Sequence, residues 1–234
     1  MTQNTTSYIS IPNKLIYDTK INTKAKYLYI ILKKHAINNK VNINYENIMS
    51  SLEWSDKRTF KKYLEILKDN NYISYDFTRI VYYLPLKIEL IFSKPFVMIA
   101  RSIVEKILIL NISKSYKTTD SKSTHKRTDS FFKEKGLIYL FFIEHLFNIQ
   151  LGYSFPSRKE LTDILKITNK ELSHIIKQYH KNHLCEYCQG EILEGSESSA
   201  TGIRRTRNRY LPNNILSNEK YRYYNHKHKD YFFK

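Results

Sequence analysis

The sequence predicts an α+β protein, mainly helical with small β-hairpins, built from two similar modules in tandem. Apolar residues recur at helical spacing over several segments. Short β-rich runs follow the helices in each half. The order of elements in the first half returns in the second, which indicates an internal duplication. The expected organisation is a domain at 1–90, a second at 91–212 and a C-terminal tail at 213–234.

The first module is expected to begin with a short strand and a helical turn within 8–17. A long helix is predicted over 23–36, because its apolar residues form a broad face. Its solvent side is expected to carry Lys24, Lys26, Lys33 and Lys34. A second helix follows over 44–52. Ser55 is the expected N-cap of a third helix, which continues to about Asp69 on the apolar positions Phe60, Tyr63, Leu64 and Leu67.

A β-hairpin is predicted directly after the third helix. Asn70 and Asn71 end that helix, and two β-rich runs follow at 72–75 and 79–84, joined by the turn 76–78. Two helices, a short turn, a third helix and a hairpin together make the order of a helix-turn-helix with a wing.

The second module repeats this order after residue 90. Residues 96–100 echo the first strand, and 131–148 echo the first long helix. A polar, basic stretch at 113–130 interrupts the module and is expected to be a flexible insertion.

The later elements of the second module also have counterparts in the first. Ser157 is the expected N-cap of the next helix, with Glu160 completing a capping box. Thr168 then opens the counterpart of the third helix, on the apolar positions Leu172, Ile175, Ile176 and Tyr179. The runs 184–189 and 203–211 are expected to form a second wing, joined by the polar loop 195–202.

The charge balance favours a polyanionic partner. The chain has 39 Lys+Arg against 22 Asp+Glu, a formal net charge of +17, and nucleic acid is the default partner of such a chain. The longest apolar run, Leu137–Ile143, is far shorter than the roughly 20 residues of a membrane span, so no membrane partner is expected. The N-terminus lacks the order of a signal peptide, which predicts a cytoplasmic protein.

Enzymatic chemistry finds little support in the sequence. Glycine-rich phosphate loops are missing, and no pattern indicates a cofactor or a small-molecule substrate. His226 and His228 superficially resemble the paired metal-binding histidines of rolling-circle nickases, but the residue between them is not apolar. We therefore expect a protein that is not an enzyme and needs no cofactor.

Residues 8–73 resemble the helix-turn-helix modules at the N-termini of plasmid replication initiators and phage replisome organisers. The segments that carry this resemblance are 11–15 (IPNKL), 23–29 (TKAKYLY), 55–64 (SDKRTFKKYL) and 70–73 (NNYI). The tandem plan is also similar to that of iteron-binding plasmid initiators, which pair two winged-helix domains. The resemblance implies sequence-specific binding of double-stranded DNA and a role in plasmid or phage DNA replication. Transcription regulation of a mobile element is the alternative, and a winged-helix protein-interaction scaffold is a further one.

A winged helix places its third helix in the major groove and its wing on the adjacent backbone. The DNA contacts expected in the first module are Ser55, Lys57, Arg58, Lys61, Lys62 and Arg79. Those expected in the second are Thr168, Asn169, Lys170, Ser173, His174 and Lys177. Arg58 is suited to guanine and Asn169 to adenine. The same residues also suit the solvated face of an amphipathic helix, and both interpretations stay open.

An arginine-rich run in the expected second wing adds to these contacts: Arg204, Arg205, Arg207 and Arg209. Strand alternation would bring the last three to one face, which suits phosphates or a narrow minor groove. The alternative is an edge strand protected by charge. The tail at 213–234 mixes aromatic and basic residues that could stack on nucleotides or fold back on their own domain, and its aromatics lean towards a homodimer.

One short cluster has the residue types of a zinc site: His180, His183, Cys185 and Cys188. A single C-x-x-C without a second pair is more often two cytosolic thiols, and three-residue spacing in a strand directs the sulfurs to opposite faces. We therefore expect no metal.

Overall fold

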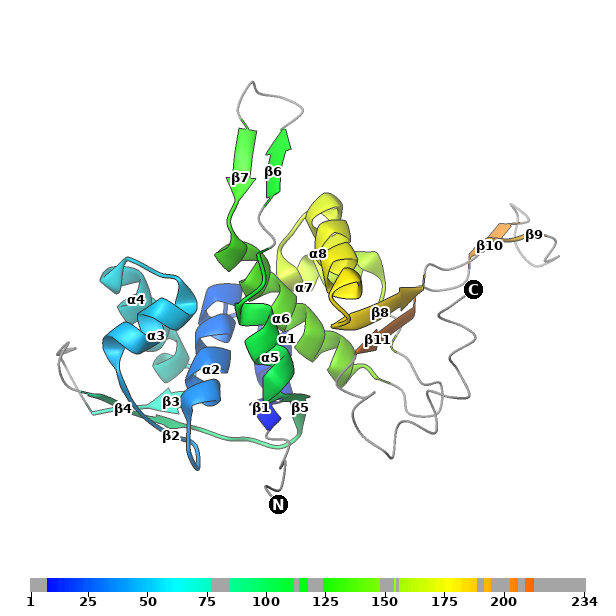
Figure 1. Cartoon of the computed structure of the whole chain (residues 1–234). Helices are drawn as coiled ribbons and strands as arrows, with labels where there is room; N and C mark the ends of the chain where they lie inside the picture. Colours follow the sequence, from blue (N-terminus) through cyan, green and yellow to red (C-terminus); the bar gives the residue numbers. More distant parts are fainter. Residues whose placement is uncertain are drawn as a thin grey trace, which may run out of the picture. The chain divides into compact units, whose positions relative to one another are not determined.

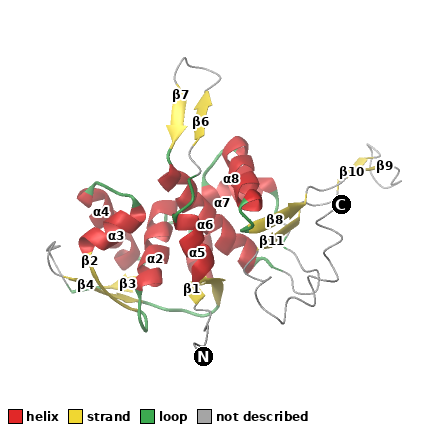
Figure 2. Ribbon diagram, in the orientation of Figure 1, coloured by secondary structure: helices red, strands yellow, loops and turns green. Residues whose placement is uncertain are grey.

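The computed structural model describes residues 8–76, 85–111, 114–117, 124–147, 154, 156–188, 192–194, 203–205 and 209–212. The protein is α+β, with helices and small antiparallel sheets (Figures 1 and 2). Two compact units divide the chain, 1–138 and 139–234. The division falls within helix α6 (Asp129–His145) and not near Leu90, where the sequence suggested a boundary.

The two strands that were predicted to echo each other are paired with each other in unit 1. β1 (Tyr8–Pro12) runs antiparallel to β5 (Phe96–Ala100), and the expected helical turn follows β1 as α1 (Asn13–Tyr17). Ile9 lies opposite Ile99, and both are buried. This pairing is the reason that the segment after Leu90 belongs to the first unit.

α2 (Thr23–His35) is the central helix of unit 1, and Asn22 caps it by accepting from the backbone N–H of Ala25. The helix is buried on all sides between Ala25 and Leu32. Lys26 is only 6% exposed, so its placement on the solvent side was wrong. Its ammonium donates to the carbonyl oxygen of Ile16 at 2.6 Å, because α1 lies against this side of the helix.

The second and third helices of unit 1 are α3 (Tyr45–Leu52) and α4 (Lys57–Asp69). As predicted, Ile48, Met49 and Leu52 face inward from α3. The N-cap of α4 is Asp56 and not Ser55, because the Asp56 carboxylate accepts from the backbone N–H groups of Arg58 and Thr59. The predicted end at Asn70–Asn71 is confirmed, with Asn70 as the C-cap and Asn71 at φ 60°.

A three-stranded sheet accompanies these helices, in the order β2 (Lys40–Asn44), β4 (Pro85–Leu90), β3 (Ile73–Ser74). The strand that pairs with β3 therefore begins at Pro85, later than the predicted run at 79–84. That run lies within 77–84, outside the described residues. β4 alternates buried Leu86, Ile88 and Leu90 with exposed Lys87 and Glu89.

The segment expected to be a flexible insertion contains a hairpin. After α5 (Arg101–Leu108), β6 (Lys114–Lys117) pairs antiparallel with β7 (Thr124–Arg127). Figure 1 shows this hairpin projecting away from the helices of unit 1. Helix α6 then begins at Asp129, slightly earlier than the predicted Phe131.

Unit 2 contains the later part of α6, followed by α7 (Arg158–Leu165) and α8 (Asn169–Lys181). β8 (Cys185–Cys188) pairs with β11 (Arg209–Pro212), and β9 (Ile192–Glu194) pairs with β10 (Ile203–Arg205). Ser154 forms an isolated bridge with Tyr210. The rings of Tyr139, Tyr179 and Tyr210 pack edge-on in the core of this unit.

The two units share helix lengths and turn geometry. α3 and α7 have 8 residues each, and α4 and α8 have 13 each. Glu53 and Lys166 occupy the left-handed region after α3 and α7. The Asn70 amide donates to the carbonyl of Ile66 at 2.8 Å, and the Asn182 amide donates to that of Gln178, also at 2.8 Å. None of the described helices is long and apolar enough to cross a bilayer.

Candidate nucleic-acid interface

Helix α4 is held on unit 1 by a stripe of three buried side chains, Phe60, Leu64 and Leu67. The ring of Phe60 packs edge-on against that of Tyr45 in α3, with 5.1 Å between the centroids. At the N-terminus of the helix, the hydrogen bond that Thr59 Oγ1 donates lowers the pKa of the Asp56 carboxyl. This packing and capping fix the orientation of the helix, and therefore which side chains it exposes.

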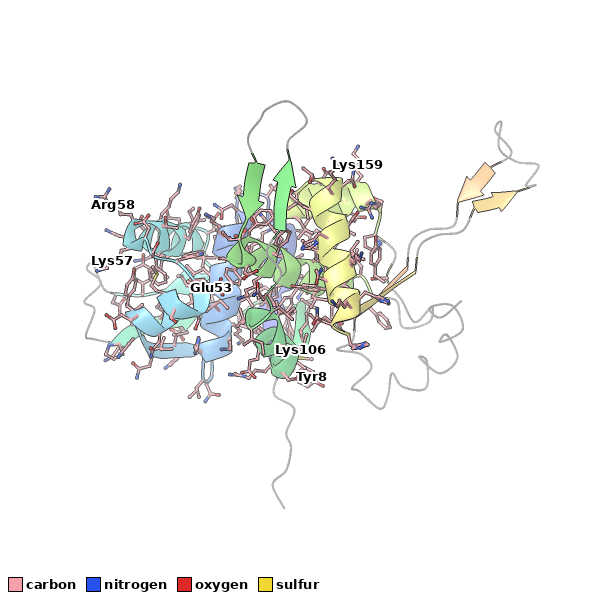
Figure 3. The ribbon with its side chains drawn as sticks, turned by 45° about the horizontal axis from the view of Figure 1, so that its top comes forward. Tyr8, Glu53, Lys57, Arg58, Lys106 and Lys159 are labelled. Carbon is pink, nitrogen blue, oxygen red and sulfur yellow. The ribbon has the colours of Figure 1, made fainter. Side chains whose placement is uncertain are left out.

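The exposed face of α4 carries the predicted basic residues. Ser55, Lys57, Arg58, Lys61 and Lys62 are all exposed. Lys57 and Arg58 project outward from the first turn of the helix (Figure 3). Lys61 lies 3.8 Å from Glu65, a surface ion pair of the kind that contributes only a few tenths of a kcal/mol. A phosphate could therefore compete for Lys61 at little cost.

The turn between α3 and α4 contains an aromatic residue that the sequence analysis did not single out. Trp54 is half-buried, and its ring lies 5.5 Å from that of Tyr63 in α4. Its backbone N–H donates to the carbonyl of Met49. Trp54 thus ties the turn to the exposed side of α4, next to Lys62, whose ammonium lies 5.9 Å from the Tyr63 ring. Trp54 directly precedes Ser55, the predicted N-cap of this helix, and this position in the sequence could have identified it.

Helix α8 is the counterpart in unit 2. Thr168 is its N-cap and forms a complete capping box with Glu171. At α7, Ser157 is the N-cap as predicted and accepts from the backbone N–H of Glu160, but the predicted capping box is not formed there, because the return bond from the Glu160 side chain is not made. Leu172, Ile175, Ile176 and Tyr179 are buried, as predicted. The predicted contact residues lie on the other side: Thr168, Asn169, Lys170, Ser173 and Lys177 are exposed, and His174 is half-buried.

Arg158, which the sequence analysis missed, lies over the first turn of α8. Its guanidinium donates to Asn169 Oδ1 at 3.4 Å, to the Asn169 carbonyl at 3.0 Å and to Ser173 Oγ at 2.6 Å. Asn169 and Ser173 are therefore already engaged, and the acceptor oxygen of Asn169 would have to leave Arg158 to read an adenine. The neighbouring Lys159 points outward (Figure 3). Its exposure makes it a further cation at this end of α7.

The remaining predicted DNA contacts are only partly covered by the described residues. Arg79 and Arg207 lie outside them. Arg204 and Arg205 belong to β10, and Arg209 begins β11. Residues 206–208 between these strands are not described, so the expected single face of Arg205, Arg207 and Arg209 stays a prediction.

Of the cluster considered for zinc, the structure describes the side chains of His180, His183 and Cys185, whereas that of Cys188 lies outside the described part. Among the described residues, no group of three or more His, Cys, Asp or Glu is arranged to hold a metal ion. Cys185 is buried, and its sulfur lies 3.4 Å from the hydroxyl of Tyr139. His180 and His183 are exposed. The thiol of Cys185 therefore belongs to the apolar core of unit 2.

Comparison of the chain with protein-family models, with curated proteins and with solved structures found no match.

Proposed function

We propose that the protein binds double-stranded DNA through two tandem winged-helix modules that arose by internal duplication. In unit 1 the order α2–β2–α3–α4–β3–β4, with β4 between β2 and β3, is the order of a winged helix. In unit 2 the order α6–α7–α8–β8–β11, with Ser154 bridging Tyr210, supports a second module of the same kind.

The observation that carries the proposal is the exposed basic face of α4. This helix is the third of its module, the one that enters the major groove in winged-helix proteins. Its buried stripe fixes it on the unit, and Lys57, Arg58, Lys61 and Lys62 remain exposed on the other side. The net charge of +17 adds a long-range attraction for a polyanion.

Initiation of plasmid or phage replication is the role that we propose first, on the resemblance of residues 8–73. Two DNA-binding modules in one chain match a binding site made of tandem direct repeats, the arrangement that an initiator binds. A transcription regulator acting as a dimer would instead select inverted repeats.

Selection of bound sequences from a random duplex library at about 150 mM salt tests both the proposed DNA binding and the proposed role in replication. At that concentration, binding to phosphates alone is weakened. An enriched motif with two half-sites is the expected result. Direct repeats favour the initiator and inverted repeats favour the regulator. Absence of enrichment would overturn sequence-specific DNA binding.

The contribution of Arg58 is tested on the DNA sequence that this selection identifies. Replacing Arg58 by alanine should weaken binding by about 1–3 kcal/mol and relax the preference for one base pair. Lys94→Ala is the matched control, because Lys94 is an exposed cation before β5, away from α4 in the chain. Equal losses in the two variants would mean that α4 reads no base through Arg58.

A further inference from the structure

The β6–β7 hairpin is a two-stranded sheet that no other strand extends among the described residues. An isolated two-stranded hairpin is only marginally stable in water. Its strands contain four cations, Lys114, Lys117, Lys126 and Arg127, and no carboxylate. The register pairs Lys114 directly with Arg127. Like charges in directly opposite positions destabilise a strand pair, so a bound polyanion would stabilise this hairpin.

The base of the hairpin is closed by polar contacts. The Asn111 amide nitrogen, oriented to donate, lies 2.9 Å from a carboxylate oxygen of Asp129. Asn111 precedes β6 and Asp129 follows β7, so this contact joins the two ends of the inserted segment. Thr128 Oγ1 accepts from the backbone N–H of Phe131 at 3.3 Å and caps the start of α6. The hairpin therefore leaves the unit from a defined position.

That position is beside the turn between α3 and α4. Ser130 Oγ donates to the carbonyl oxygen of Leu52 at 3.2 Å, and the Lys133 ammonium donates to the Glu53 carboxylate. All four residues belong to unit 1. Glu53 faces Lys133 at the start of α6, and Lys57, at the start of α4, points outward (Figure 3). The start of α6, which follows the hairpin, and the start of α4 thus both lie at this turn.

We propose that the β6–β7 hairpin is a second element of unit 1 that contacts duplex DNA, binding phosphates that flank the site of α4. The inference rests on the proposed function. At about 3.4 Å per residue, each strand extends roughly 13 Å, enough to reach across a major groove about 12 Å wide from one phosphate backbone to the other. The other explanation of the lysines is protection of the free strand edges against association. Edge protection requires no phosphate contact, and this difference is measurable.

The test compares two variants of the full chain on the selected duplex. The hairpin variant combines Lys114→Gln, Lys117→Gln, Lys126→Gln and Arg127→Gln. The control variant combines Lys14→Gln, Lys20→Gln, Lys94→Gln and Lys106→Gln, all exposed cations of unit 1 outside α4 and the hairpin. Both variants lose the same number of charges, so a general effect of net charge is equal in the two.

The hairpin variant should bind about tenfold more weakly than the control variant at about 150 mM salt. Its slope of log K against log salt should also be less steep than that of the control variant, by about 2–4. Hydroxyl-radical footprinting should show lost protection only at phosphates that flank the α4 site. A charge-conserving variant, Lys114→Arg with Lys117→Arg and Lys126→Arg, should retain affinity. Removal of the opposed charges should leave the melting temperature of the hairpin variant unchanged or higher, which separates the effect from misfolding.

Several results would overturn the inference. If the hairpin and control variants bind the duplex equally well, the hairpin makes no phosphate contact and the proposed function stands without it. The inference also fails if the hairpin variant loses affinity only for single-stranded RNA. If the wild-type chain selects no duplex sequence, the proposed function fails and the inference fails with it.

Discussion

The ammonium of Lys133 donates to the carboxylate of Glu53, joining the start of α6 to the turn between α3 and α4. The side chain of Lys133 is 6% exposed and that of Glu53 is 41% exposed. The carboxylate therefore compensates a cation that has lost most of its contact with water.

Removal of this carboxylate should be costly. Glu53→Ala leaves the Lys133 ammonium buried without its anion and should lower the free energy of unfolding by about 2 kcal/mol, less than for a fully buried pair because Glu53 reaches water. Lys133→Met removes the buried charge itself and should cost less. Urea unfolding followed by the fluorescence of Trp54, the single tryptophan of the chain, measures both. A larger loss for Lys133→Met would contradict the argument.

Arg158 should matter more for DNA binding than Asn169. In the free protein Arg158 holds both Asn169 and Ser173 at the start of α8, and its charge is available to a phosphate. Arg158→Ala should therefore weaken binding about tenfold, and Asn169→Ala by less. Lys181→Ala, at the far end of α8, controls for the loss of one charge. A specificity change confined to Asn169→Ala would show that Asn169 leaves Arg158 to read a base.

Unit 2 should be sensitive to the capping box at the start of α8. Thr168→Ala removes the hydroxyl that accepts from the backbone N–H of Glu171 and should cost about 1 kcal/mol. Thr168→Ser preserves the hydroxyl and should cost little. Amide hydrogen exchange in the first turn of α8 reports the change locally. Equal exchange in the alanine and serine variants would mean that Glu171 alone holds the helix start.

Unit 1 should lose stability on mild acidification through His35. Burial, followed by the charges of Lys34 and Arg101, lowers the pKa of His35 below its usual 6.5. Between these two pKa values the unfolded chain binds the proton and the folded chain does not, so the free energy of unfolding falls as the pH drops below about 6.5. His35→Gln should flatten this dependence. The measurement is the urea midpoint by Trp54 fluorescence at about pH 7.5 and pH 5.5. An unchanged slope in the variant would contradict the role of His35.

Helices with a clear apolar stripe could be predicted from the sequence almost to the residue. Phe60, Leu64 and Leu67 define α4, and Leu172, Ile175 and Ile176 define α8, because one buried face per helix leaves a period that can be read directly. Lys26 could not be placed from its own helix, since α1 covers the side that the pattern leaves for water.

The exposure of the basic residues on α4 could be predicted from the sequence, whereas the contacts between elements could not. Lys57 and Arg58 are exposed on α4 as the pattern predicted. The bonds from Arg158 to α8 and from Lys133 to Glu53 join residues on different elements, and helical spacing carries no information about such contacts.

The pairing of β1 with β5 has a consequence for the order in which the chain folds during synthesis. Pro12 lies opposite Phe96 and Tyr8 lies opposite Ala100, so β1 has no partner until β5 has been made, about 80 residues later in the chain. The helices between them can form early from local contacts, whereas closing this long loop is slow. Ile9 and Ile11 then remain exposed on the nascent chain, where a chaperone that binds short apolar segments could hold them until β5 is made.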